Sequence, residues 1–448
     1  EPFYNTETAL EDVLVVRHDI FTNGIGYFNF SFDVTDVPKE LLPYLVILKG
    51  ILGYMDTEHF SYSEFSNEIG IHTGGLYQEV GAYRDAKAFD KYQIRFEVKG
   101  KVFFDKIDKA IELMEEMIFH TKLEDEKRLY EIICEGKSSL QGILMRSSDS
   151  AAVLRNLSYI SEIGIINEHM RGITYYKFVE NLEADFENKK TEIVTMLRKL
   201  ISHVFRKENL VIGYTANDEG YQYFEKAVPG LLKRLEENNG KTMDFAGFDN
   251  DLTPVNKNEG FKTSAQVQYV TRTGNFVKKG FEYNGALKVL KMILVSEYLW
   301  KNIREQGGAY GCNCVFSRCG ESYFSSYRDP NLSKTNDVFE HVAEYIRNFD
   351  TDERNMTKYV IGTISGMDTP LTAIAKGNRS MSAYFNHETI ENLKKERLQV
   401  LQASQEQIRG FADLVASVLE DNNICVIGNE GKIETEAGLF KQTVNLFE

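Results

Sequence analysis

The chain has 448 residues, 42% hydrophobic and 27% charged, with a formal net charge of -15 at pH 7. This length exceeds the usual limit of one hydrophobic core, so two domains are expected. The negative charge argues against nucleic acid as a partner, because a phosphate backbone is bound by Lys and Arg. It suits basic peptides, although solubility alone is the simpler explanation of an acidic chain.

The chain ends and the cysteines bear on the compartment. No apolar run approaches the roughly 18 to 20 residues that span a bilayer, and no signal peptide is seen, so no membrane is expected. The chain begins Glu1-Pro2-Phe3 without an initiator Met, which predicts a piece of a longer protein. Five cysteines, an odd number, predict no disulfide framework and a reducing compartment, cytoplasmic or an organelle matrix. Cys312, Cys314 and Cys319 lack the His or second Cys pair of a zinc site, so we interpret them as buried structural thiols.

The first part of the chain predicts an α+β domain over residues 1–237. Phe28, Phe30 and Phe32 alternate with polar residues, as in an antiparallel strand with one face in water. Further strands are expected at 77–83, 92–98 and 209–214, and helices at about 38–51, 61–69, 102–120, 124–206 and 219–237. Residues 238–262 are polar and turn-rich and are predicted to be an interdomain linker.

The second part, 263–448, repeats this plan. A strand is expected at 265–269, a long helix at 286–306, strands at 309–317 and 322–328, a helix at 335–349 and a closing strand at 425–428. The offset of roughly 215 residues indicates a duplicated α+β domain. Each of the two tandem domains is predicted to be an antiparallel or mixed sheet with helices packed on one face.

The stretch from Arg304 to Gly311 is the candidate site. It follows the long apolar helix, and Gly307 and Gly308 can cap that helix and turn the chain into a strand. The simpler interpretation of Arg304 is a cation that complements the helix dipole. The alternative is that Arg304 and Tyr310 offer a guanidinium and a phenol to a peptide carbonyl or carboxylate. Their spacing alone does not decide between the two.

Other catalytic patterns are missing from the sequence. A zinc peptidase needs two His and a carboxylate as ligands, and no His here has a His partner at helical spacing. We therefore interpret the eight histidines as unrelated and predict no metal site: His18, His59, His72, His120, His169, His203, His341 and His387. The glycine run lacks the Lys-Ser/Thr of a phosphate loop, and no Gly-x-Ser-x-Gly elbow is present.

A family resemblance rests on three stretches. They are Arg304-x-x-Gly307-Gly308-Ala309-Tyr310-Gly311, Phe324-Ser325-Ser326-Tyr327-Arg328-Asp329-Pro330-Asn331, and an opening with Gly24-Ile25-Gly26-Tyr27-Phe28 and His59-Phe60-Ser61-Tyr62. Nearly the whole chain resembles the C-terminal half of the pitrilysin (insulinase) family of zinc metalloendopeptidases, in the presequence-protease and falcilysin branch. The resemblance implies two metallohydrolase-like domains, the third and fourth of that family.

The resemblance also implies a function. The zinc would be bound by an N-terminal half that is not in this chain, and the two halves would close around unfolded oligopeptides. Tyr310 would donate its hydroxyl to the carbonyl under attack, Arg304 would hold a neighbouring carbonyl, and Gly307 and Gly308 would permit close approach. This chain alone is then expected to be inactive. The alternative is a non-catalytic scaffold or peptide-binding subunit that pairs with a catalytic homologue.

Overall fold

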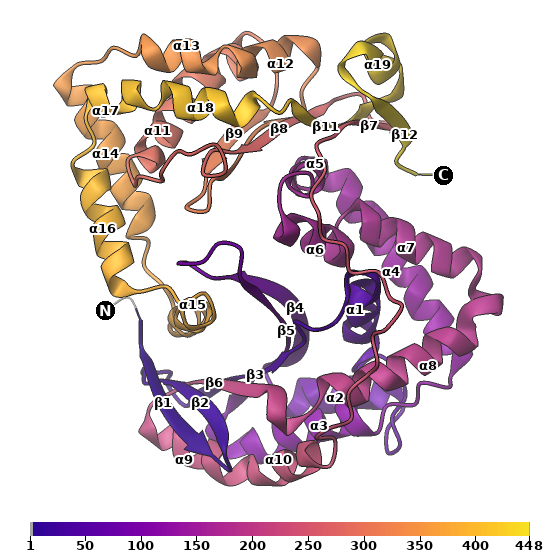
Figure 1. Ribbon diagram of the computed structural model, residues 1–448. Helices are drawn as coiled ribbons and strands as arrows, with labels where there is room; N and C mark the ends of the chain where they lie inside the picture. Colours follow the sequence, from indigo (N-terminus) through magenta and orange to yellow (C-terminus); the bar gives the residue numbers. More distant parts are fainter. Residues whose placement is uncertain (1–2, 448) are drawn as a thin grey trace. The chain divides into compact units, whose positions relative to one another are not determined.

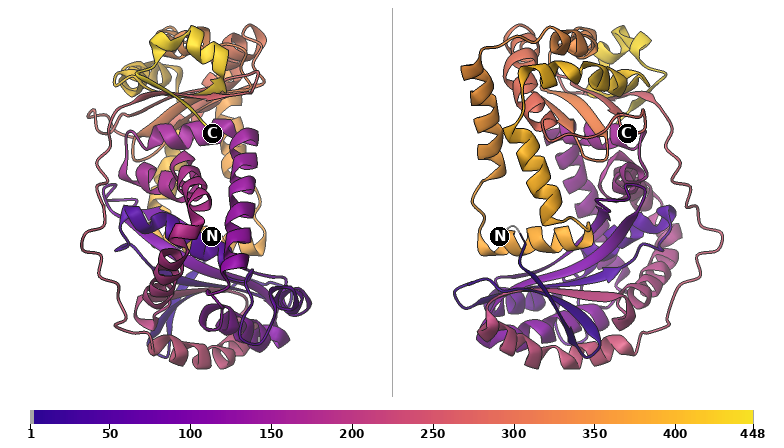
Figure 2. Two further views of the ribbon diagram at one scale, coloured as in Figure 1. Left: turned by 90° about the vertical axis from the view of Figure 1, so that its right-hand side faces the viewer. Right: turned by 60° about the vertical axis from the view of Figure 1, so that its left-hand side comes forward.

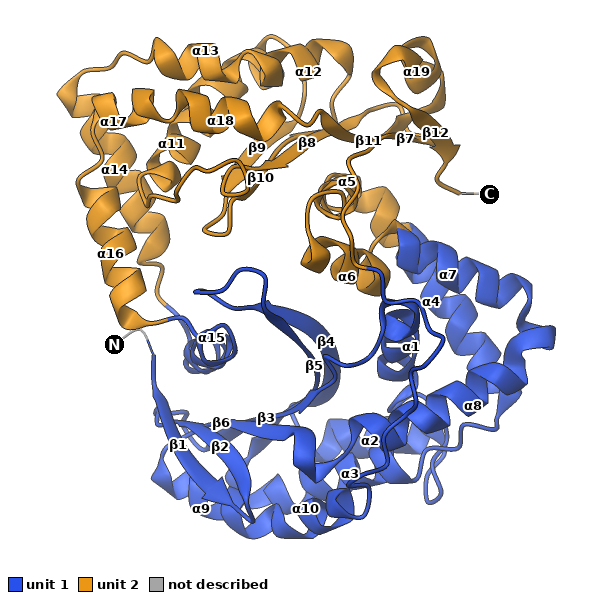
Figure 3. Ribbon diagram, viewed as in Figure 1, with its two compact units in different colours: residues 1–141, 174–251, 371–388 blue, residues 142–173, 252–370, 389–448 orange. Residues whose placement is uncertain are grey.

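The structure is a computed structural model that describes residues 3–447. The chain forms two compact units, and neither is continuous in sequence (Figure 3). Unit 1 comprises Glu1–Gln141, Thr174–Asp251 and Leu371–Glu388, and unit 2 comprises Gly142–Ile173, Leu252–Pro370 and Thr389–Glu448. Each unit therefore contains a segment from the other half of the chain. The sequential domains expected at 1–237 and 263–448 stay a prediction.

Unit 1 contains a mixed sheet with the strand order β1-β2-β6-β3-β5-β4 (Figure 1). Its strands are β1 Asn5–Leu10, β2 Val13–His18, β3 Ile25–Asp33, β4 Gly75–Arg84, β5 Tyr92–Phe103 and β6 Leu210–Thr215. The β2–β6 pair is parallel and the other pairs are antiparallel. We call this the first sheet.

Unit 2 contains the second sheet, with the order β12-β7-β11-β8-β10-β9. Its strands are β7 Asn258–Thr263, β8 Tyr269–Asn275, β9 Gly311–Phe316, β10 Glu321–Tyr327, β11 Asn423–Asn429 and β12 Gln442–Asn445. From β7 to β9 the order and directions repeat those from β2 to β4, with one parallel pair, β7–β11. The predicted duplication of an α+β domain with mixed sheets is thus confirmed.

The core of unit 1 lies on the aromatic face of the first sheet. Phe30 contacts Phe224 with ring centroids 6.1 Å apart, and Phe32 contacts Phe205 at 5.1 Å. The opposite face was predicted to be wet, and that is wrong for its centre, because Ser31 is 0% exposed. Helix α15, Ala373–Phe385, packs on that face. The second half of the chain supplies this cover, so the local alternation could not show it.

Unit 2 has the same plan. Helices α11, α12, α13 and α18 and the apolar side of the second sheet form one core. The opposite face is covered by α5, where Asn156 Nδ2 donates to the Thr271 carbonyl oxygen at 3.0 Å. The guanidinium of Arg155, also on α5, donates through Nε to Glu259 Oε2 on β7 at 2.8 Å. Helix α5 comes from the first half of the chain, as α15 comes from the second.

The remaining helices surround these sheets (Figure 2). In unit 1 they are α1 Leu42–Ile51, α2 Tyr62–His72, α3 Ile107–Phe119, the larger part of α4 Glu126–Arg146, α7 Ile173–Ala184, α8 Phe186–Val204, α9 Asp218–Ala227 and α10 Pro229–Glu236. In unit 2 they are α5 Ser148–Leu157, α6 Glu162–Arg171, α11 Leu287–Ile293, α12 Ser333–Glu340, α13 Val342–Arg347, α14 Glu353–Met367, α16 Ile390–Leu401, α17 Gln405–Gly410, α18 Ala412–Leu419 and α19 Glu430–Thr435. Within residues 3–447, no helix is both long and apolar enough to cross a membrane.

Two local predictions near the domain boundary are wrong. The expected linker 238–262 includes most of β7, which pairs in parallel with β11. The strand expected at 265–269 begins only at Tyr269. Gln268 instead forms an isolated bridge with Asp329, with both main-chain hydrogen bonds present at 2.7 and 2.9 Å. Its side chain accepts a hydrogen bond from the Asn429 main chain at 2.8 Å.

Candidate functional site

The candidate site begins on the helix that follows β8. Helix α11 continues as two π-helical segments, η4 Leu294–Tyr298 and η5 Trp300–Glu305. The Gln306 main-chain N–H reaches the Lys301 carbonyl oxygen five residues back, at 3.0 Å. The predicted helix is confirmed in extent, but its α-helical geometry is wrong beyond Ile293. A π-helix is wound more loosely than an α-helix, and such segments are often found at functional sites.

Two glycines end this helix. The Gly308 N–H donates to the Arg304 carbonyl oxygen at 2.9 Å, and the Ala309 N–H donates to that of Ile303 at 3.1 Å. Gly308 has a φ of +80°, which other residues rarely adopt. Gly307 is needed for a different reason, because a Cβ there would collide with the Ile303 carbonyl oxygen. The predicted glycine cap is therefore confirmed.

Arg304 lies in the last helical turn with its side chain exposed. Its guanidinium carbon is 4.0 Å from the centre of the Trp300 ring, four residues earlier. The Trp300 indole N–H in turn donates to Glu305 Oε1 at 3.1 Å. Within residues 3–447, the Arg304 side chain makes no hydrogen bond or ion pair. Trp300 supports the flat guanidinium face and leaves the N–H groups at its edge available.

Tyr310 lies just beyond the glycine turn. Its main-chain N–H donates to the Tyr327 carbonyl oxygen at 3.0 Å, which fixes it at the start of β9. Its side chain is 69% exposed and has no hydrogen-bond partner among the described residues. The guanidinium of Arg328 lies 5.9 Å from the Tyr310 ring and 5.6 Å from that of Tyr327. The phenol hydroxyl of Tyr310 is thus available to a ligand.

A buried turn after β10 supports the glycines. Asp329 is fully buried and accepts hydrogen bonds from Thr335 Oγ1 at 2.6 Å and from the Asn331 main chain at 2.8 Å. The Asn331 amide donates to the Gly307 carbonyl oxygen at 2.6 Å. Burial raises the pKa of the Asp329 carboxyl. This turn couples the position of Gly307 to the folded state of β10.

Sequence reasoning missed Trp300 and Arg328 as parts of this site. Trp300 precedes Arg304 by four residues, a spacing at which helical side chains meet, so the sequence did carry a signal. Arg328 gave no signal, because it meets Tyr310 only through the pairing of β9 with β10. Arg328 has a φ of +46°, a conformation uncommon for a residue other than glycine.

A metal centre does not fit the side chains present. Among residues 3–447, no group of three or more His, Cys, Asp or Glu side chains is arranged to hold a metal ion. The histidines are not all unrelated, however, and that interpretation is wrong for one pair. The rings of His59 and His120 lie 5.6 Å apart, and their Nδ1 atoms bond to Glu116 at 2.8 Å and Glu58 at 2.7 Å. The hydrogen bond from Glu116 raises the pKa of His59.

The cysteines are all free thiols. Cys314 and Cys425 are buried, as expected for structural thiols. Cys312 and Cys319 are only half-buried, which corrects the prediction for these two. Burial raises the pKa of Cys312 to about 11, so it is a protonated thiol at neutral pH.

Two family profiles match the chain. The profile of the region associated with subfamily C of the M16 peptidases matches residues 2–182, and "PreP C-terminal domain" matches residues 258–430. Protein HypA of Clostridium perfringens is 37% identical over 97% of this chain and 44% of its own length. Presequence protease 1, chloroplastic/mitochondrial, of Arabidopsis thaliana is 29% identical over 95% of this chain and 39% of its own length. The chain thus spans less than half the length of these relatives.

A solved structure shows the same fold. The peptidase M16 inactive domain from Pseudomonas fluorescens superposes with a TM-score of 0.59, covering 95% of this chain and 98% of that domain at 12% identity. This similarity concerns the fold, and the word "inactive" describes that protein. With the two profile matches, it shows that the chain belongs to the M16 (pitrilysin) peptidases, where it corresponds to the C-terminal half of a presequence-protease-like peptidase.

Proposed function

We propose that this chain is the C-terminal, substrate-binding half of a zinc-dependent metalloendopeptidase that degrades unfolded oligopeptides. An N-terminal half would bind the zinc, and this half would close over it. The observation that carries the proposal is the exposed Arg304 and Tyr310, whose side chains have no hydrogen-bond partner within residues 3–447, on a rigid glycine turn. Relatives about twice as long as this chain support a partner half in the same polypeptide.

The two side chains would have different tasks. The Tyr310 hydroxyl would donate a hydrogen bond to the carbonyl oxygen at which negative charge develops, an interaction that strengthens in the transition state. The Arg304 guanidinium would hold a neighbouring substrate carbonyl and fix the peptide in place. Gly307 and Gly308 would let the substrate approach the main chain closely. None of these tasks requires a metal ligand from this chain.

Tyr310→Phe in the full-length enzyme tests the first task. Removing one hydrogen-bond donor to a developing oxyanion is expected to lower kcat on the order of 100-fold and to change KM little. Tyr223→Phe is the matched control, because Tyr223 is 45% exposed on α9 of unit 1. Its turnover should stay within about twofold of wild type. Turnover of Tyr310→Phe within that same range would contradict the role given to Tyr310.

The single tryptophan of the chain tests the second task directly. Trp300 stacks on Arg304, so a peptide that engages the guanidinium should change the tryptophan emission of this chain. We expect a saturable change with a peptide of about 20 to 30 residues that contains no tryptophan, and a smaller affinity for Arg304→Lys. An equal affinity for wild type and Arg304→Lys would contradict substrate binding by Arg304.

A non-catalytic scaffold or peptide-binding subunit is the second candidate function. The fold similarity to an inactive M16 domain favours it as far as this chain alone is concerned. The two proposals differ in the native polypeptide. One covalent chain of about twice 51.3 kDa, measured by mass spectrometry of the natural protein, would support the peptidase half. A mature protein of about 51.3 kDa would support the separate subunit.

The location and the substrate are also proposals. Five free cysteines suit a reducing compartment, the cytoplasm or an organelle matrix. The net charge of -15 suits basic unfolded peptides. Peptide digestion by the full-length enzyme at about 0.05 and about 0.5 M salt would test this point. Basic peptides should lose turnover at the higher salt, and neutral peptides of the same length should not.

A further inference from the structure

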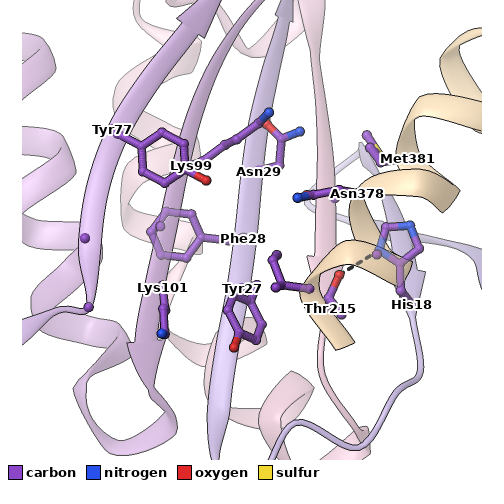
Figure 4. Close-up of a pocket in the computed structure, with 16 residues that line it drawn as sticks. His18, Tyr27, Phe28, Asn29, Tyr77, Lys99, Lys101, Thr215, Asn378 and Met381 are labelled. Atoms are coloured by element: carbon purple, nitrogen blue, oxygen red, sulfur yellow. Dashed lines mark hydrogen bonds between the residues drawn. The ribbon is translucent and has the colours of Figure 1, made fainter. Parts of the chain in front are cut away.

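A pocket of about 200 Å³ lies on the α15 face of the first sheet, wholly within unit 1 (Figure 4). Its walls come from β3, β4, β5 and β6 on one side and from α15 on the other. Asn378 and Met381 project from α15 toward the strands. This pocket is distinct from the glycine turn of unit 2, and the proposed function makes no use of it.

The strand pairing aligns five of its residues in one row. Gly75 pairs with Lys101, Lys101 with Tyr27, Tyr27 with Thr215, and Thr215 with His18. Paired residues point to the same face of a sheet, so this row crosses the pocket floor at right angles to the strands. From Lys101 to His18 there are three strand spacings, roughly 14 Å, which is about four residues of extended chain.

Glycines let α15 lie directly on this floor. A Cβ at Gly377 of α15 would collide with Thr215 Oγ1, and a Cβ at Gly213 of β6 would lie 3.0 Å from the Met381 sulfur. At the other edge the Lys101 stem lies along Gly74, where a Cβ would be 3.0 Å from its Cδ. The Gly74 N–H also donates to the Lys101 carbonyl oxygen at 2.7 Å. The pocket is therefore built from close main-chain contacts.

Two buried polar atoms around this pocket have no partner among the described residues. His18 is 2% exposed, and its Nδ1 bonds to Thr215 Oγ1 at 2.9 Å, while Nε2 has no hydrogen bond. Asn29 donates from its amide to Glu97, while its Oδ1 has no hydrogen bond. Buried polar groups are rarely left unpaired, so each such group calls for an explanation. A ligand with main-chain amide groups would supply both partners.

The charges around the pocket favour an anionic end on that ligand. The ammonium group of Lys99 is paired with the carboxylates of Glu79 and Glu97. Lys101, two residues further along β5, is exposed and has no carboxylate partner within residues 3–447. Burial lowers the pKa of His18 to about 4, so its ring is neutral and does not compete for the anion.

We propose that this pocket binds the C-terminal residues of a short peptide, with the terminal carboxylate on Lys101 and main-chain amides on Asn29 and His18. The apolar surface of Tyr27 and Met381 would contact the peptide side chains. The proposal rests on the proposed function in that peptides are the expected ligands. It assigns a second peptide-binding position, in unit 1, to the substrate or product of that peptidase.

Methyl NMR of the 448-residue chain with ¹³C-labelled methionine tests the proposal. The probe is acetyl-trialanyl-leucine, either with a free carboxylate or as its C-terminal amide. The Met381 signal, assigned with Met381→Leu, should shift with the free acid, and the amide should bind at least about tenfold more weakly. Lys101→Gln should lower the affinity for the free acid about tenfold without changing that for the amide. Lys91→Gln, at an exposed lysine without a carboxylate partner among the described residues, is the matched control and should bind as wild type.

Three results would overturn the proposal. They are a Met381 signal that does not move, equal binding of acid and amide, and equal binding by wild type and Lys101→Gln. An amide carrying an internal glutamate that binds as tightly as the free acid would show that the pocket takes acidic side chains and not chain ends. Failure here leaves the proposed function intact, because that function is read from Trp300 emission and from turnover of Tyr310→Phe. Normal Met381 shifts with normal turnover of Tyr310→Phe would have the reverse meaning.

Discussion

Replacing Trp300 with alanine in the full-length enzyme is expected to weaken peptide turnover, because the indole ring supports the Arg304 guanidinium at 4.0 Å. A cation–π contact at an exposed position contributes about 0.5 to 1 kcal/mol. Trp300 is 39% exposed, so we expect no more than this range. Since about 1.4 kcal/mol corresponds to a factor of ten, kcat/KM should fall about two- to fivefold.

A double-mutant cycle separates this support from other effects. Turnover of wild type, Trp300→Ala, Arg304→Ala and the double variant gives the coupling energy between the two side chains. We expect a coupling of about 0.5 to 1 kcal/mol, because removing the indole should matter little once Arg304 is absent. Trp300→Phe keeps an aromatic face and should recover part of the loss.

Additive effects of Trp300→Ala and Arg304→Ala would refute the reasoning. The control is the pair Arg128 and Tyr62 in unit 1, where the guanidinium lies 4.2 Å from the ring centre. Tyr62→Ala removes a contact of the same kind from a surface to which no function is assigned. It should leave kcat/KM within about 1.5-fold of wild type, close to no effect on the scale of RT ln 10.

Three further predictions concern stability. Gly308→Ala should cost about 1 to 2 kcal/mol, because φ is +80° while the added Cβ would meet only Pro330 at an ordinary 3.6 Å; an unchanged unfolding midpoint would contradict this strain. Glu259→Ala removes a buried partner of Arg155 and should destabilise unit 2 by about 3 to 5 kcal/mol, measured by thermal unfolding. Burial lowers the pKa of His18 from 6.5 to about 4, so the unfolded chain binds the extra proton in this range and unit 1 should lose stability as the pH falls from 6.5 toward 4. His18→Gln should show a flatter pH profile than wild type.

Patterns that repeat locally were predictable from the sequence. The alternation of Phe28, Phe30 and Phe32 places these rings in the core, and the apolar face of residues 287–303 places that helix on the second sheet. The glycine pair predicted the end of that helix, and the structure shows the left-handed φ at Gly308. In each case the residues that determine the feature lie within about two helical turns or one strand, which is where periodicity carries information.

The hairpin of β1 and β2 was missed because its turn is atypical. Glu11 and Asp12 form the two-residue connection, with φ values of 49° and 66°. Such turns usually carry Asn-Gly or Asp-Gly, which is the signal that sequence reasoning uses. Strand β1 also pairs with β2 alone, so its side chains lack the regular apolar alternation of an inner strand.

The remaining misses depend on contacts between distant residues. His59 and His120 meet because Thr57 and Thr121 form a bridge, and no local pattern records such a pairing. The pocket under α15 was missed for the same reason, since α15, Ala373–Phe385, follows β6, Leu210–Thr215, only after a long stretch of other elements. An amphipathic helix shows which of its faces is apolar, but not which sheet that face will cover.

The exchange of α5 and α15 between the two halves has a consequence for any attempt to separate them. A single proteolytic cut between residues 240 and 251 would break the connection that looks like an interdomain boundary. It would not free two self-sufficient fragments, because each fragment would keep a helix that belongs to the other fragment's sheet. The nicked protein should therefore elute as one species until it is denatured. Chimaeras that swap the halves of two relatives at this boundary would have to match two helix–sheet interfaces as well as the join itself.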